Sequence, residues 1–282
     1  MAEFQAGGRR FPLGNRSYVM GILNVTPDSF SDGGRFFSPE AAVTQAISLQ
    51  EAGADILDIG AQSTRPGAER IGLEEELSRL RPALESLHCK LEIPVSIDTF
   101  YPECARFALE QGACIVNDVS GTVDSKMAEV VRAYDAGWII MHNPCGTDRR
   151  QEDGRTAYPE GVTAAVGHFF REALKQALSY GLRPEQICLD PGFGFGKRPA
   201  ENRALLRELE RVRTSGIALL VGLSRKRFIA EAVGSCDLAA LDAGTLAGHS
   251  LAIQNGADFI RVHNVKMAVA AARAADSVVR ML

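Results

Sequence analysis

The sequence has no apolar run long enough to cross a bilayer, and residues 1–10 lack the apolar core of a signal peptide. The charge balance is also small, because 31 Lys and Arg residues nearly offset 35 Asp and Glu residues and leave a net charge of −4. A broad nucleic-acid or membrane-binding surface is therefore not expected, and small molecules are the default partners. We expect the protein to act in the cytoplasm.

The six cysteines form no C-x-x-C pair, are widely spaced and in several cases lie inside apolar runs. This pattern is typical of reduced core thiols and argues against both a disulfide framework and a cysteine zinc site. A reducing compartment is therefore expected, in agreement with the absence of an export signal.

Several catalytic signatures are missing as well. The histidines have no helical H-x-x-x-H pairing, and the chain has neither a nucleophile elbow nor a Ser-His-Asp spacing, which argues against zinc hydrolysis and acyl transfer. The glycine-rich run at 192–197 (GFGFGK) fits neither the phosphate loop G-x-x-x-x-G-K-S/T nor the dinucleotide fingerprint G-x-G-x-x-G. We therefore reject a nucleotide P-loop.

What the chain does contain is one repeating unit, in which a helical segment ends at a glycine, a short apolar run follows, and a polar residue ends that run. Near-copies of the helix-to-strand phrase occur at 51–60 (EAGADILDIG), 110–118 (EQGACIVND) and 254–263 (QNGADFIRVH). By this rule eight strands are expected, at 18–23, 56–59, 95–97, 115–116, 138–141, 187–189, 219–222 and 259–262.

Helical patterns with one apolar face lie between these strands. They are expected at 39–51, 74–88, 102–111, 125–134, 162–178, 199–213 and 265–281, with room for two helices within 225–255. Eight alternating units without a linker predict an α/β protein, a single (β/α)8 TIM barrel over residues 17–282 with a short N-terminal hairpin or arm over residues 1–16. An open doubly wound sheet is the less favoured arrangement.

In a barrel of this kind the loops that follow the strands build the active face, so residues at the strand ends are the first candidates for function. Nearly all of them can bind ions or form hydrogen bonds: Asn24, Asp58, Asp98, Asn117, His142, Asp190, Ser224 with Arg225 and Lys226, and Arg261 with His263. We expect these side chains to converge on one site.

Asp98 and Asp190 end the third and sixth strands, so they would face a central ligand from opposite sides of the barrel mouth. Buried carboxylates need hydrogen-bond donors, which a heterocycle with an exocyclic amine and ring N–H groups supplies, and Asn117 suits a mixed donor and acceptor edge. Two simpler roles stay open: Asp98 as the N-cap of the helix that begins near Pro102, and Asp190 as part of a plain turn.

Cations are expected on the other side of the mouth. In a net acidic chain, Arg65, the run from Arg225 to Arg227, Arg261 and a protonated His263 indicate an anionic substrate, with phosphate the natural candidate. Ordinary ion pairing for Arg65 and solvated helix starts for Arg225 and Arg227 are the alternatives.

Residues 20–36 change abruptly from an apolar strand to a polar, glycine-rich segment, which marks a strand that runs into a loop. Asn24 falls at the end of the strand, where its side-chain oxygen could bind a hard ion such as Mg²⁺ whose other ligands come from substrate phosphates. Residues 25–36 are interpreted as a lid over the site, poorly ordered when substrates are absent, with a plain solvated loop as the alternative.

Segments along nearly the whole chain closely resemble, in order, the motifs of the dihydropteroate synthases: 21–34 (GILNVTPDSFSDGG), 58–67 (DIGAQSTRPG), 96–99 (SIDT), 117–121 (NDVSG), 189–197 (LDPGFGFGK), 221–226 (VGLSRK) and 261–263 (RVH). The resemblance implies a (β/α)8 barrel, usually a homodimer, that uses Mg²⁺ and is a sulfonamide target. Members of this family join 6-hydroxymethyl-7,8-dihydropterin diphosphate to p-aminobenzoate, giving 7,8-dihydropteroate and pyrophosphate in folate biosynthesis.

The resemblance also implies roles for individual residues. The pterin would be bound by Asp98, Asn117, Met141, Asp190, Phe195, Lys226 and Arg261. The pyrophosphate would be bound by Asn24, which also touches the metal, and by Thr64, Arg65, Arg261 and His263. The p-aminobenzoate would be bound by Phe30, Thr64, Pro66, Ser224 and Lys226. The catalytic residues implied are Asp98, Lys226 and Arg261.

Two places depart from the family pattern, namely residues 143–150 (NPCGTDRR) and the bulky Phe100 and Tyr101. They put local loop contacts in doubt but remove none of the assigned residues. The competing functions are a methyltetrahydrofolate–corrinoid methyltransferase domain, which shares the pterin pocket, and a non-catalytic pterin-binding protein. The segments 24–30 (NVTPDSF) and 63–67 (STRPG) favour the synthase, because the methyltransferases should lack both.

Overall fold

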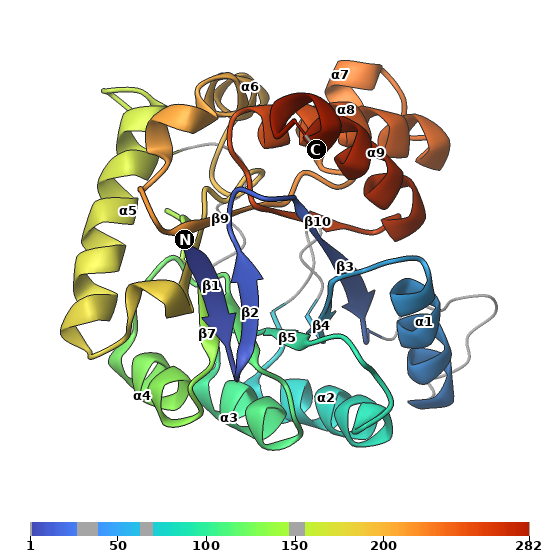
Figure 1. Ribbon diagram of the computed structural model, residues 1–282. Helices are drawn as coiled ribbons and strands as arrows, with labels where there is room; N and C mark the ends of the chain where they lie inside the picture. Colours follow the sequence, from blue (N-terminus) through green and yellow to red (C-terminus); the bar gives the residue numbers. More distant parts are fainter. Residues whose placement is uncertain (1, 27–38, 63–69, 147–155, 282) are drawn as a thin grey trace.

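The computed structural model describes residues 2–26, 39–62, 70–146 and 156–281. Its centre is a closed barrel of parallel strands in the order β10-β3-β4-β5-β6-β7-β8-β9 (Figure 1). The barrel strands are β3 (Tyr18–Asn24), β4 (Ile56–Gly60), β5 (Val95–Asp98), β6 (Ile115–Asp118), β7 (Gly137–Met141), β8 (Ile187–Asp190), β9 (Ala218–Val221) and β10 (Phe259–Val262). A separate antiparallel pair, β1 (Glu3–Ala6) and β2 (Arg9–Pro12), precedes them.

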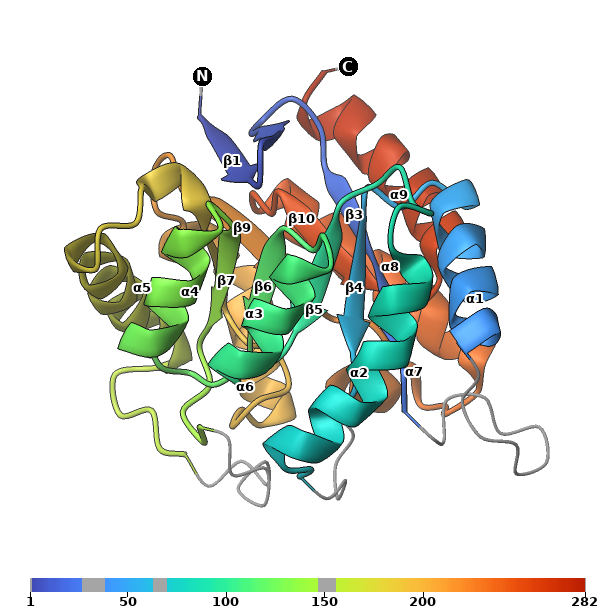
Figure 2. The ribbon, with the colours of Figure 1, turned by 90° about the horizontal axis from the view of Figure 1, so that it is seen from below.

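Helices follow the strands and surround the barrel (Figures 1 and 2). They are α1 (Pro39–Glu51), α2 (Leu73–Leu87), α3 (Pro102–Glu110), α4 (Ser125–Ala133), α5 (Val162–Ser179), α6 (Pro199–Arg207), α7 (Arg227–Val233), α8 (Leu238–Gln254) and α9 (Val265–Val279), with the 3-10 turns η3 (Pro184–Gln186) and η4 (Leu209–Val212). The predicted (β/α)8 barrel with an N-terminal hairpin is confirmed, and the open sheet is wrong. None of these described helices has both the length and the apolar character that crossing a membrane requires.

The expected strands agree with the observed ones to within one or two residues. The differences gather at the strand ends, where Asp98 and Asp190 are the last residues of β5 and β8 rather than the first residues beyond them. The helix expected at 199–213 divides into α6 and η4. In η4 the tighter 3-10 turn places Leu209 and Val212, three residues apart, on one buried face next to α5.

Side chains of the barrel strands alternate between two apolar layers. Inward-facing residues pack together in the interior: Tyr18, Met20, Ile56, Ile115, Ile139, Cys188, Ala218, Leu220 and Phe259. Outward-facing residues pack beneath the helices, among them Val19, Leu57, Ile97, Val116, Trp138, Leu189, Leu219, Val221 and Ile260. The interior layer forms an apolar floor below the polar residues at the strand ends.

The β1–β2 hairpin covers the end of the barrel at which the strands begin (Figure 2). Phe4 and Phe11 each pack against Phe259 with ring centroids 5.6 Å apart, and Phe11 lies 5.2 Å from the ring of Tyr18. Gly137 at the start of β7 leaves room for this packing, because a Cβ there would lie 2.4 Å from Cζ of Phe4. The hairpin therefore fills this end of the barrel with apolar rings.

His249 on α8 is buried, and its Nε2 accepts a hydrogen bond of 3.2 Å from the backbone N–H of Leu223, which follows β9. Burial lowers the pKa of His249 from 6.5 to about 3. Below about pH 6.5 the unfolded chain therefore binds a proton that the folded protein does not. The contribution of His249 to stability is complete above that pH and is lost as the pH falls from 6.5 toward 3.

We expect His249→Gln to make the protein less sensitive to acid, because a glutamine oxygen can accept the same N–H bond without titrating. Between about pH 8 and about pH 5.5, the free energy of unfolding of the wild type should fall by about 1.4 kcal/mol more than that of the variant. Urea unfolding at both pH values measures the difference, with the exposed His168→Gln as control. The same pH dependence in wild type and His249→Gln would contradict this account.

Candidate active site

Polar side chains gather at the end of the barrel where the strands finish. In the register of the sheet, Gly60 of β4 lies beside Asp98 of β5, Asp98 lies beside Asn117 of β6, and Met141 of β7 lies beside Asp190 of β8. The three polar residues are buried, with exposed fractions of 8% for Asp98, 2% for Asn117 and 6% for Asp190. The structure thus brings these predicted residues to one end of the barrel.

Arg261 of β10 is the central cation of this group. Its Nε donates to Asp58 Oδ2 at 2.6 Å, and its Nη2 donates to Asp98 Oδ2 at 2.8 Å. Burial alone would lower the pKa of Arg261, but the charges of Asp58 and Asp98 outweigh that effect and raise the pKa above its ordinary value. One fixed positive charge therefore lies between two buried carboxylates.

Asp58 of β4 belongs to this group, although the motif resemblance assigns it no role. It is fully buried, and the oxygen that accepts from Arg261 also accepts a 3.0 Å hydrogen bond from Asn117 Nδ2. The sequence did contain a signal for these contacts. Asp58 lies two residues before Gly60, so both residues are on the same face of the strand. Sequence reasoning identified Asp58 as a strand-end residue but missed its contacts.

The helix-cap role for Asp98 is wrong. The N-cap residue of α3 is Tyr101, whose side chain makes no hydrogen bond to the helix, and the backbone N–H of Tyr101 donates to Thr99 Oγ1 at 3.1 Å. The carboxylate of Asp98 binds Arg261 instead. Gly60 gives it space, since a Cβ at that position would lie 3.3 Å from Cβ of Asp98.

Asp190 both closes a turn and faces the barrel mouth. Its Oδ1 accepts a hydrogen bond of 2.7 Å from the backbone N–H of Gly192, so the turn that the sequence left open as an alternative does exist. Burial raises the pKa of Asp190, while the positive charge of Lys226 acts in the opposite direction. This carboxylate is therefore sensitive to any donor or charge placed next to it.

Lys197 holds the segment between β8 and α6 from the inside. Its Nζ donates to the backbone carbonyls of His142, Gly192 and Phe195 at 3.3, 2.8 and 3.1 Å. Only 3% of the residue is exposed, and burial lowers the pKa of Lys197 to about 7. A lysine whose ammonium is bound by three backbone carbonyls has a structural role, because it stabilises this segment. That role agrees with the rejection of a P-loop at 192–197.

A small apolar cluster lies beside this segment. Phe195 packs with Met141, and Phe100 packs against this pair. Lys226 Nζ lies 4.6 Å from the ring centroid of Phe195 and donates to the backbone carbonyl of Phe193. The structure therefore brings together Met141, Phe195 and Lys226, three of the residues that the resemblance assigns to a pterin.

Ser224 and His263 form a second pair at the mouth. Ser224 Oγ and His263 Nδ1 are 2.8 Å apart, and the backbone N–H of His263 donates to the same hydroxyl at 3.2 Å. Arg225 is not a solvated helix start, because its Nε and Nη2 donate to Asp242 of α8 at 2.7 and 3.0 Å. Arg227 is the first residue of α7 and is exposed, as its simpler interpretation predicts.

Asn24, the last residue of β3, is half-buried, and its side chain makes no hydrogen bond to another described residue. Its amide oxygen is therefore available to a ligand. Most of the segment interpreted as a lid lies outside the described residues. So do four of the predicted site residues: Phe30, Thr64, Arg65 and Pro66.

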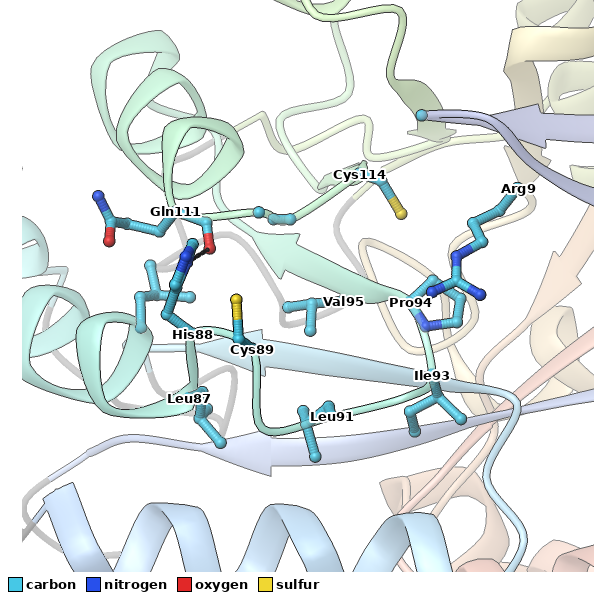
Figure 3. Close-up of a pocket in the computed structure, with 14 residues that line it drawn as sticks. Arg9, Leu87, His88, Cys89, Leu91, Ile93, Pro94, Val95, Gln111 and Cys114 are labelled. Atoms are coloured by element: carbon cyan, nitrogen blue, oxygen red, sulfur yellow. Dashed lines mark hydrogen bonds between the residues drawn. The ribbon is translucent and has the colours of Figure 1, made fainter.

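A cavity of about 330 Å³ lies at a different place, beside the start of β5 (Figure 3). Its lining includes Arg9 of β2, His88 and Cys89 after α2, Val95 of β5 and Cys114 before β6. Among the residues that the structure describes, no predicted site residue lines it. The cavity is at the end of the barrel where the strands begin and is separate from the group around Arg261.

Comparison with known proteins identifies relatives over nearly the whole chain. A family model described as pterin binding enzyme matches residues 20–263. The dihydropteroate synthase of Synechocystis sp. is 44% identical over 275 residues, which cover 97% of this chain and 94% of that protein.

Solved structures agree with the sequence comparison. The dihydropteroate synthase of Clostridium difficile, solved in the presence of pteroic acid, matches with a TM-score of 0.88 and 41% identity over 96% of this chain and 99% of that one. The dihydropteroate synthase of Xanthomonas albilineans with 4-aminobenzoic acid matches with a TM-score of 0.89 and 40% identity. The match covers 99% of this chain and 98% of that one. The chain therefore belongs to the pterin binding enzymes and, within them, to the dihydropteroate synthases.

Proposed function

We propose that this protein is a transferase of folate biosynthesis that joins 6-hydroxymethyl-7,8-dihydropterin diphosphate to p-aminobenzoate, giving 7,8-dihydropteroate and pyrophosphate. The observation that carries the proposal is the buried group of Asp98, Asn117 and Asp190 beside Lys226 and Arg261. Relatives solved with pteroic acid and with 4-aminobenzoic acid support this reaction over methyl transfer to a corrinoid.

The pterin ring is proposed to lie between the strand ends of β5, β6 and β8. Asp98 and Asp190 would accept hydrogen bonds from its ring and exocyclic N–H groups, and Asn117 would pair with a mixed edge. Burial supports these roles, because a carboxylate withdrawn from water needs such donors. Met141 and Phe195 would form the apolar walls, with Lys226 and Arg261 in contact with the ring.

The diphosphate is proposed to lie against cationic and polar groups: Asn24, Thr64, Arg65, Arg261 and His263. Asn24 is also the proposed protein ligand of Mg²⁺, and its available amide oxygen fits an ion that takes few protein ligands and completes its shell with phosphates and water. When bound, the ion would supply charge neutralisation for the departing pyrophosphate.

The p-aminobenzoate is proposed to lie at the rim of the mouth, in contact with Phe30, Thr64, Pro66, Ser224 and Lys226. The Ser224 hydroxyl is held by the ring and backbone of His263, which fixes its position for a ligand. Sulfonamides, which imitate p-aminobenzoate, are proposed to compete for this subsite.

The proposed reaction breaks the C–O bond between the pterin methylene and the diphosphate, and the electron pair leaves with pyrophosphate. Asp98 and the other ring contacts stabilise the positive charge that then spreads over the pterin. The amine of p-aminobenzoate attacks the methylene carbon and releases its proton to solvent. The protein contributes position and charge rather than a covalent intermediate.

We propose a cytoplasmic location for this reaction. All six cysteines are free thiols in the structure, and Cys104 and Cys188 are buried. Burial raises the pKa of both thiols, which makes them unreactive core residues. Reduced cysteines of this kind are typical of a reducing compartment.

We also propose a homodimer that forms through α8. The helix is largely apolar, and its polar residues Asp242, Thr245 and His249 lie on the buried side. A helix with this composition is normally covered all around. Yet its outer face is exposed and carries no charged residue: Leu238, Ala239, Ala243, Ala247 and Leu251. A second copy of the chain is the partner proposed for that face.

The purified protein should release pyrophosphate and form dihydropteroate in equal amounts when it is given both substrates and Mg²⁺. Chelation by EDTA should lower the rate at least tenfold, and added Mg²⁺ should restore it. Omission of p-aminobenzoate is the control. Folded protein without turnover would refute the proposed reaction, and turnover unaffected by EDTA would refute the metal requirement.

Asp98→Asn should lose about 10²- to 10³-fold in turnover while keeping the fold, because the charge that stabilises the pterin cation is removed. Steady-state kinetics and circular dichroism measure the two effects. Asp124→Asn is the matched control, since Asp124 caps α4 by accepting from the backbone N–H groups of Lys126 and Met127. Turnover of Asp98→Asn at the rate of that control would leave Asp98 without a catalytic role.

Ala247→Glu should convert the dimer into a monomer of 30.4 kDa, because it places a charge on the outer face of α8. Light scattering after size-exclusion chromatography gives the mass. Ala164→Glu changes an exposed alanine on α5 and should leave the dimer intact. A wild-type monomer, or a dimer unaffected by Ala247→Glu, would contradict the assignment of this face.

A further inference from the structure

We propose that Asp58 is a positioning residue that acts through Arg261. By holding the guanidinium, Asp58 keeps it from blocking the Asp98 carboxylate when a pterin binds. The proposal rests on the function proposed above. It concerns a carboxylate that the motif resemblance leaves without a role.

The contacts of Asp58 fix the positions of two neighbouring side chains of the site. One oxygen, Oδ2, accepts both from Arg261 Nε at 2.6 Å and from Asn117 Nδ2 at 3.0 Å. The side chain is fully buried, so this oxygen is not reached by solvent. A single atom of β4 therefore fixes side chains that come from β10 on one side and β6 on the other.

The position of Asp58 in the barrel explains how it reaches both partners. Asp58 pairs in register with Ser96 of β5, whereas Gly60, two residues later, pairs with Asp98. Asp58 thus lies one inward-facing position below the rim, and the absence of a side chain at Gly60 leaves the space above it to Asp98. Arg261 extends across β3 into this space and contacts both carboxylates.

The two bonds of Arg261 have different consequences for a ligand. The Nη2 bond engages Oδ2 of Asp98, the carboxylate that the proposed function uses to accept from the pterin ring. A pterin that binds Asp98 shares the carboxylate with this bond, while the Nε bond to Asp58 can persist. Asp58 then holds the guanidinium beside the ring. Without Asp58, the guanidinium is free to donate to both oxygens of Asp98 through Nε and Nη2 and to compete with the pterin.

A purely stabilising role fits the structure less well. Asp58 Oδ1 and the neighbouring Ser96 Oγ are both buried without a hydrogen-bond partner in the described part of the chain. Unsatisfied buried acceptors are costly, and a buried ion pair is weak support for stability.

Asp58→Asn tests the proposal, with Asp258→Asn as the matched control. Asp258 is also fully buried with an unpartnered Oδ1, but it precedes β10 at the opposite end of the barrel and accepts from the backbone N–H of Leu219. Asp58→Asn should lower kcat/KM for the pterin diphosphate by about 10- to 100-fold, the loss that is typical when a residue supporting a metal ligand is mutated. The KM for p-aminobenzoate should stay unchanged, and Asp258→Asn should alter only the melting temperature.

A double-mutant cycle with Arg261→Gln separates positioning from stability. Asp58→Asn leaves Arg261 paired with Asp98, so the single variant keeps a buried ion pair and should fold. Combined with Arg261→Gln, the same change is measured where no guanidinium is present to be positioned. In the Arg261→Gln background, Asp58→Asn should have little further effect on kcat/KM. A further loss of tenfold or more would overturn the proposal, as would an Asp58→Asn enzyme that behaves like Asp258→Asn. An inactive wild type would instead refute the proposed function.

Discussion

The guanidinium of Arg261, held between Asp58 and Asp98, is the interaction on which the barrel mouth depends. It joins β10 to β4 and β5, and Asp58 extends the connection to Asn117 of β6. Buried charges are tolerable only when each has its partner, so removal of Arg261 would take the shared cation from two buried carboxylates. Closure of the barrel is what brings these strands within reach of one side chain, because β3 alone separates β10 from β4.

The apolar floor below this group strengthens it. The interior layer and the rings of Phe4, Phe11 and Phe259 fill the barrel from the opposite end. Electrostatic interactions in such surroundings are stronger than in water. At the mouth itself, burial raises the pKa of Asp190 and lowers that of Lys197, which are opposite effects of one cause.

The sequence was sufficient for the barrel and for most of the mouth because both follow from local patterns. Helix-stop phrases and apolar runs predict the strands, and parallel strands must present their ends together. The contacts of Asp58, Lys197 and Arg225 could not be predicted, since each depends on which distant atoms the closed barrel places nearby. Arg225 illustrates this point, because its partner Asp242 lies on α8 and no local pattern links the two.

Helix α8 connects the site to the face proposed for dimerisation. On its buried side, His249 and Thr245 accept hydrogen bonds from backbone N–H groups of segment 223–226, and Asp242 binds the arginine of the same segment. That segment ends with Lys226, whose ammonium lies over the ring of Phe195. The helix thus fixes one wall of the site with its polar side and exposes its apolar side. A partner packed on the outer face would therefore limit movement of α8 and, through these bonds, keep Lys226 in place.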